Sequence, residues 1–203
     1  MPTTASPAAT TAPDASQRLD EGLAASQAGD SGRANELFGQ AQALAPAWHL
    51  PPFLLGSENA AMGDFERAEG YFAQTVLLAP DFPIARYQLG LLQFSGGRTH
   101  LAMLTWGPLG SLPEGDSPFP HLVQGFGALA RGDLDAARRH FESGLPLASS
   151  NQGLQADVAR VLGALKEQAG AERPAAPDAG APPAADNAAS HVLLSNYANG
   201  TVH

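Results

Sequence analysis

Histidine and carboxylate side chains are the groups of this chain that could catalyse a reaction or bind a metal ion. The histidines are scattered and show no metal-ligand spacing such as HExxH: His49, His100, His121, His140, His191 and His203. No local motif joins a serine to a histidine and an acid, and no glycine-rich phosphate loop follows an expected strand. The carboxylates of Glu21, Asp30, Asp64 and Asp133 suit turns and helix surfaces better than a catalytic pair. We therefore expect a protein without enzymatic activity, metal or cofactor.

Charge and composition exclude several classes of partner. The net charge is −9 and the 11 basic side chains include one lysine, Lys166, so the chain lacks the basic face that nucleic acids and anionic membranes require. No cysteine is present, and no apolar run approaches the ~20 residues of a membrane span. The stretch from Met1 to Ser16 lacks the basic and apolar segments of a secretory signal. We expect a cytoplasmic protein that binds no nucleic acid and does not insert into a membrane.

A repeated pattern of glycine, alanine and aromatic residues runs through most of the chain. The glycines Gly29, Gly63 and Gly97 lie 34 residues apart, and Gly132 follows after 35. An aromatic residue follows each of them nine residues later: Phe38, Phe72, Trp106 and Phe141. A fixed period of about 34 residues with this pattern predicts an array of helix–turn–helix units.

Four repeats are predicted, covering residues 15–48, 49–82, 83–116 and 118–151, which together span 15–151. In the first, the small residues Gly22 and Ala34 let two helices approach closely, while Phe38 fills the space between successive units. Asp30 or Ser31 can cap the second helix through its exposed amides. In the third repeat, Gly107-Pro108 predicts a shortened second helix followed by an irregular loop, because proline interrupts the helical hydrogen bonds.

The segments outside the repeats differ in composition. Residues 1–14 are expected to be a disordered leader, and 169–190 an Ala/Pro-rich linker. Between the repeats and the linker, 152–168 predicts an amphipathic helix that caps the last apolar face of the array. The tail, 191–203, interrupts the polar tract with four apolar side chains: Val192, Leu193, Leu194 and Tyr197.

The repeats resemble the tetratricopeptide repeat family, most clearly at Gly56, Gly63-Asp64, Ala68, Phe72 and Pro80. The resemblance covers about two thirds of the chain. It implies an all-α fold, a right-handed superhelical α-solenoid of four helix pairs with a capping helix. It further implies a concave groove that is lined by the first helix of each repeat and binds peptides.

The groove positions that this register implies are mostly apolar or aromatic: Leu19, Leu50, Phe53, Tyr87, Leu91, Phe94, Phe119, Leu122 and Phe126. Each of these side chains could instead pack between neighbouring helices. Family members that grip a C-terminal carboxylate use lysine and asparagine at such positions, whereas the single lysine here lies outside the array. The resemblance therefore favours a protein or peptide partner with apolar or aromatic anchors.

Three functions fit these features. The first is a non-catalytic adaptor or scaffold that holds an apolar peptide or helix in its concave groove. The second is a bacterial secretion or assembly chaperone for a hydrophobic client, and the third is a structural component that associates with itself. The tail at 191–203 could dock in the groove of its own chain or on a partner protein, or it could have no role.

The register predicts that Phe72→Ala destabilises the array more than Phe53→Ala. Phe72 occupies the position between helices, where truncation leaves a cavity that costs ~3–5 kcal/mol. Phe53 faces the groove, so its truncation should cost less stability and more partner binding. Thermal melts of the two variants in the reverse order would contradict the register.

Overall fold

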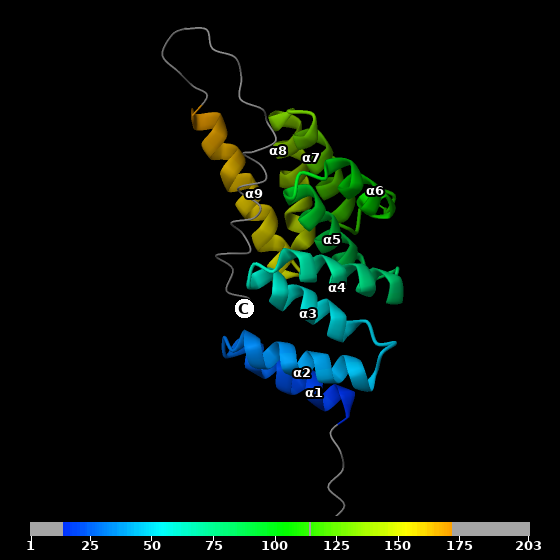
Figure 1. Cartoon of the computed structure of the whole chain (residues 1–203). Coiled ribbons are helices and arrows are strands. Elements are labelled where there is room, and N and C mark those ends of the chain that lie inside the picture. The colour runs from blue at the N-terminus through cyan, green and yellow to red at the C-terminus, as the bar shows by residue number, and fades with distance from the viewer. Residues whose placement is uncertain (1–13, 114, 172–203) are drawn as a thin grey trace, which may run out of the picture.

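Four antiparallel helix pairs follow one another along the molecule in the computed structural model, which describes residues 14–113 and 115–171 (Figure 1). The pairs are α1 Ala15–Gln27 with α2 Ser31–Leu44, α3 Leu50–Ala61 with α4 Phe65–Leu78, α5 Pro83–Ser95 with α6 Thr99–Gly110, and α7 Phe119–Ala130 with α8 Leu134–Gly144. Each helix packs against its partner, and the second helix of each pair packs against the first helix of the next. Within the described residues all regular elements are helical. The prediction of an all-α solenoid is confirmed, and each predicted repeat contains one helix pair.

A glycine with positive φ makes the turn inside each pair. The φ values are 79° at Gly29, 82° at Gly63, 75° at Gly97 and 75° at Gly132. A β-carbon at these positions would meet nothing within 4 Å, so the backbone conformation and not the space requires glycine. The next residue caps the second helix in three pairs: the carboxylates of Asp30, Asp64 and Asp133 accept hydrogen bonds from backbone amides three residues on.

A second set of glycines lets an aromatic ring lie directly against the first helix of each pair. A β-carbon built on Gly56 would lie 2.8 Å from the ring of Phe72, and one built on Gly90 would lie 2.2 Å from Trp106 Nε1. Gly22 faces Phe38 and Gly125 faces Phe141 in the same way. The indole N–H of Trp106 donates a hydrogen bond of 3.0 Å to the carbonyl of Tyr87, so its polar atom is satisfied inside the core.

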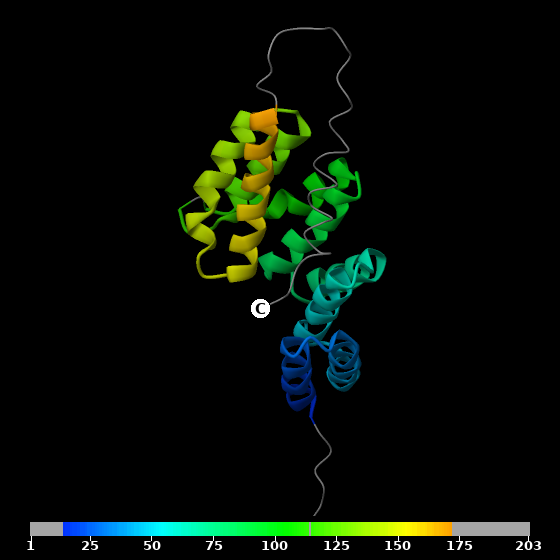
Figure 2. The ribbon, with the colours of Figure 1, turned by 90° about the vertical axis from the view of Figure 1, so that its left-hand side faces the viewer.

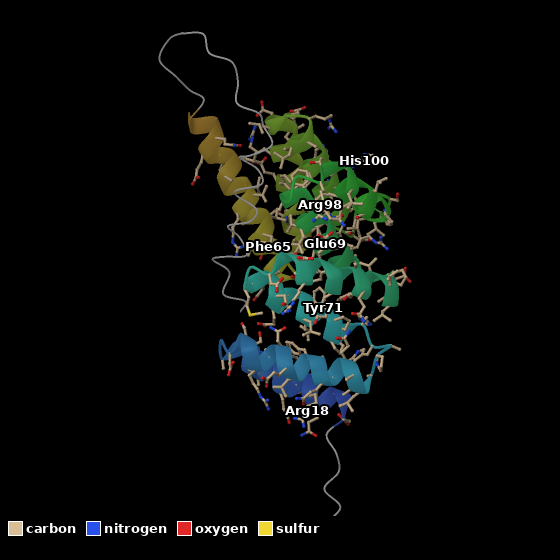
Figure 3. All side chains as sticks on the ribbon, in the orientation of Figure 1. Arg18, Phe65, Glu69, Tyr71, Arg98 and His100 are labelled. Carbon is tan, nitrogen blue, oxygen red and sulfur yellow. The ribbon has the colours of Figure 1, made fainter. Side chains whose placement is uncertain are left out.

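The third pair departs from the others in its second helix. Arg98 replaces the capping aspartate, and its guanidinium instead forms an ion pair with Glu69 of α4, with nitrogen–oxygen distances of 2.8 and 2.5 Å. Figure 3 shows these two side chains pointing toward one another. The carboxylate of Glu69 raises the pKa of Arg98 by hydrogen bonding and charge. This ion pair fixes the start of α6 against the preceding pair.

Pro108 lies inside α6, so the helix does not end at Gly107-Pro108 as the predicted shortening implied. The helix has 12 residues, against 14 in α2 and α4 and 11 in α8, and it continues past the proline to Gly110. The proline removes one bond to the carbonyl of Leu104 close to the end of the helix. Leu104 is exposed, so water can reach that carbonyl and the cost of the missing bond is small.

Two predicted boundaries shift at the ends of the array. Asp14, assigned to the leader, caps α1 by accepting a hydrogen bond of 2.8 Å from the amide of Gln17. The capping helix, α9 Gln152–Ala171, follows a short 3₁₀ helix, η1 Pro146–Ala148, and continues past residue 168 into the segment predicted as linker. The tail residues Val192, Leu193, Leu194 and Tyr197 lie outside the described residues.

Adding a methyl group at Gly90 should destabilise the protein, whereas adding one at Gly70 should not. Gly90→Ala places a β-carbon against Trp106, and such overpacking costs roughly 1–3 kcal/mol. Gly70 lies in exposed, helical surroundings on α4 with nothing within 4 Å, so Gly70→Ala should stabilise by up to ~1 kcal/mol through helix propensity. Urea unfolding of both variants measures the difference, and equal shifts would contradict the proposed packing role of Gly90.

Candidate functional site

The inner face of the array is the candidate site, defined here as the face of α1, α3, α5 and α7 that carries the predicted groove residues. Seven of the nine are at most 7% exposed: Leu19, Tyr87, Leu91, Phe94, Phe119, Leu122 and Phe126. Leu19 packs in the core of the first two pairs, and the other six belong to the core of the last two pairs. Only Leu50 and Phe53 are partly exposed. These seven side chains therefore pack between neighbouring helices, the alternative that the sequence left open, and they are not exposed along a groove.

Helix α9 packs mainly against α8 and η1. Its apolar side chains share one core with the six buried groove residues: Leu154, Val158, Val161, Leu162 and Leu165. The side chain of Gln88 on α5 also hydrogen-bonds the carboxylate of Asp157 on α9. In Figure 2, α9 runs along the front of the group formed by α5 to α8. The capping helix therefore also contacts the preceding pair, through Gln88 on α5.

Asp157 introduces a charge into this otherwise apolar contact. Burial raises its pKa from the ordinary 3.8 to about 6, while the nearby charge of Arg160 and the hydrogen bond from Gln88 act in the opposite direction. The nitrogen–oxygen distance to Arg160 is 3.2 Å, and the Asp157 side chain is 20% exposed. At neutral pH the contact between α9 and α5 therefore holds a partly desolvated carboxylate, which weakens it.

The inner face stays accessible around Leu50 and Phe53 on α3. The Phe53 ring packs at 5.8 Å from Phe72 and at 5.1 Å, edge to face, from Phe82, which in turn lies 5.0 Å from His49. These contacts hold one side of the Phe53 ring while the residue remains partly exposed. A fixed aromatic ring with one accessible side is suited to binding an apolar side chain from another molecule.

A set of polar contacts lies near the end of α3, on the same helix as Leu50 and Phe53. Glu58 is buried and accepts a hydrogen bond from the hydroxyl of Ser26 on α1. Its neighbour Asn59 donates to the side chain of Asn35 at 3.0 Å and to the carbonyl of Leu55 at 2.7 Å. These bonds join the first two pairs at one end of α3, so the accessible surface lies on a rigid support.

Two residues of this face were not found from the sequence, Gln88 and Asp157. Asp157 falls on the same helical side as Leu154, Val158 and Val161, and an acid inside an apolar stripe is the signal that could have identified it. Gln88 carries no comparable signal, because its role arises from a contact with a distant helix.

Neither a metal-ligand cluster nor a membrane-spanning helix is found in the part of the chain that the structure describes. There, no three histidine or acidic side chains gather closely enough to hold a metal ion. No described helix combines the length and the apolarity that crossing a bilayer requires.

Replacing Asp157 by asparagine should stabilise the protein at neutral pH and not in acid. Because the folded-state pKa is raised, the stability contributed by the protonated carboxyl is present below pH 3.8 and is lost as the pH rises through about 6. The loss amounts to at most about 3 kcal/mol. Asp157→Asn should therefore raise the free energy of unfolding at pH 7.5 by roughly 1–3 kcal/mol and change it little at pH 3.5.

Asp135 provides the matched control for this experiment. It forms the same type of ion pair, 3.2 Å to Arg138 three residues on, but its side chain is 79% exposed. Asp135→Asn should leave the pH dependence of unfolding unchanged. If the two variants behave alike in urea titrations at both pH values, the burial of Asp157 does not control the stability of this contact.

No family model matches the chain. No curated protein matches it either. Membership of the tetratricopeptide repeat family therefore remains a prediction from the repeated residues.

Proposed function

We propose that this protein is a non-catalytic interaction module, an adaptor that binds an apolar or aromatic segment of a partner protein on the inner face around Leu50 and Phe53. The observation that carries the proposal is the position of α9. The last two pairs hold an amphipathic helix through apolar side chains. The first two pairs belong to the same array and have no such helix over Leu50 and Phe53 among the described residues.

The chemistry of α9 indicates what the partner should present. Its buried side chains, Leu154, Val158, Val161, Leu162 and Leu165, recur at helical spacing along one side. A partner helix with the same spacing would place an apolar side chain on the accessible side of Phe53 and another beside Leu50. Because the adaptor carries a net charge of −9, basic residues flanking these anchors would speed association.

The accessible ring of Phe53 supports the same assignment on energetic grounds. Binding sites are dominated by a few aromatic or aliphatic anchors that sit on rigid supports. Phe53 has this support from Phe72 and Phe82, so little conformational entropy is lost when a partner covers it.

A charge placed beside Phe53 tests this proposal. Ser57 lies one helical turn after Phe53, is partly buried, and donates a hydrogen bond of 3.1 Å to the Phe53 carbonyl. Peptides selected from a random display library against the full chain should share apolar or aromatic anchors. Ser57→Glu should weaken their binding at least about tenfold, because the new carboxylate would be desolvated by the bound segment.

Ser143 is the matched control, since its hydroxyl makes the same bond, 3.0 Å to the carbonyl of Arg139, on the exposed side of α8. Ser143→Glu should leave the peptide affinity within about twofold. Calorimetric titration of the selected peptides into both variants gives the comparison. Failure to select any peptide, or equal loss of affinity in both variants, would exclude the proposed surface.

A further inference from the structure

Helix α6 has an uncharged and apolar outer side. Its residues Thr99–Gly110 include no Asp, Glu, Lys or Arg, whereas α2, α4 and α8 each carry several charged residues. Leu101 is 42% exposed and Leu104 63% exposed, and both Gly107 and Pro108 are exposed as well. These four residues lie on one helical side and are called the α6 stripe below.

The fold does not require leucine at these positions. The repeat period identifies the equivalent positions in the other pairs. Leu101 corresponds to Arg33, Arg67 and Ala136, and Leu104 corresponds to Glu36, Gly70 and Arg139. None of these residues has a large apolar side chain. The other pairs pack in the same way, although several of these positions carry charged side chains that face water. The leucines of α6 therefore have no role inside their own pair that the other pairs need.

The α6 stripe is held on a rigid helix. The opposite side of α6 is anchored by Trp106, which is fully buried against α5, and by the ion pair between Arg98 and Glu69. In Figure 3, Arg98 and Glu69 lie between α4 and α6, while His100 marks the start of α6 at the outer side. A helix that is apolar all round is normally covered on every side. The exposed stripe is thus a fixed apolar surface that lacks a cover within the described residues.

We propose that the α6 stripe is covered by the α6 stripe of a second copy of this chain. Two copies with a net charge of −9 repel one another, so a contact between them is favoured where neither surface carries charge. Among the second helices of the four pairs, only α6 meets that condition. A helix pair of this kind buries apolar area and desolvates no charged group.

The shape of the stripe is complementary to itself. Leu104 projects from the helix, and one turn further on Gly107 leaves open space where a β-carbon would otherwise stand. When two α6 helices pack antiparallel about a two-fold axis between these positions, Leu104 of each copy lies over Gly107 of the other. A two-fold contact needs such a self-complementary surface.

A dimer joined through the α6 stripe would carry two inner faces. The α6 stripe lies on a second helix and the residues Leu50 and Phe53 lie on a first helix, so pairing through α6 leaves the proposed binding surface available. A partner with two apolar segments would then bind with increased avidity.

Sedimentation equilibrium of the full chain, from about 1 to 200 µM, tests the proposal. The wild type should approach twice its monomer mass of 20.9 kDa with rising concentration. The double variant Leu101→Arg with Leu104→Glu, which introduces the residues that the first repeat has at these positions, should raise the dissociation constant at least tenfold without changing the melting temperature. A wild type that stays monomeric, or a dimer that the double variant leaves intact, would overturn the proposal.

Three further variants distinguish this contact from non-specific apolar association. Leu77→Glu removes a leucine that is 82% exposed but lies on α4, and it should leave the dissociation constant unchanged. Leu104→Glu and Leu104→Arg should each be monomeric alone and should form a mixed dimer when combined, because opposite charges then lie near one another on either side of the two-fold axis. Loss of the dimer with Leu77→Glu, or a mixture that stays monomeric, would refute the pairing of α6 with itself.

Discussion

The close contact between a glycine and an aromatic ring is the constraint on which the rest of this structure depends. In each of the four pairs the first helix lacks a β-carbon where the ring of the second helix lies, as at Gly56 with Phe72 and at Gly90 with Trp106. The contact sets the separation of the two helices, and the positive-φ glycine of the turn sets their direction. Since every pair repeats both devices, every pair has the same geometry and successive pairs can stack. The regular array follows from local rules applied four times.

Regular stacking explains part of the difference between the two ends of the inner face. An array of pairs always leaves an apolar side on its last pair, and α9 covers it. A helix as long as Gln152–Ala171 extends beyond one pair, so it also reaches α5, where Gln88 bonds Asp157. The inner-face residues of α5 and α7 are buried, whereas Leu50 and Phe53 on α3 are partly exposed. Leu19 on α1 is also buried and belongs to a core that α9 does not join, so α9 accounts for only part of this difference.

Much of the fold could be predicted from the sequence because it is encoded by residues close together in the chain. The turn glycines, the caps such as Asp30 and the small residues beside the rings act within one pair, so their spacing alone reveals them. The burial of Tyr87 and Phe126 could not be predicted, because it depends on ring contacts between several helices, with Trp106, Phe119 and Phe141. The continuation of α6 past Pro108 was missed for a related reason. The cost of a proline depends on the exposure of the carbonyl that it leaves unpaired, and the sequence does not give that exposure.

Repeats that fold by the same local rules offer an internal reference for identifying function. A residue type that packing requires recurs in every pair, as the aromatic ring does. A residue type that occurs in only one pair, at an exposed position, is not required for the stability of the fold. Leu101 and Leu104 are of this kind, and Phe53 is an inner-face residue that keeps an exposed side. These positions lie on different helices of their pairs, one set on a first helix and the other on a second. The array thus separates two exposed apolar surfaces in space. Leu101 and Leu104 can be substituted without altering the contacts that hold the pairs together, whereas Phe53 also packs against Phe72 and Phe82.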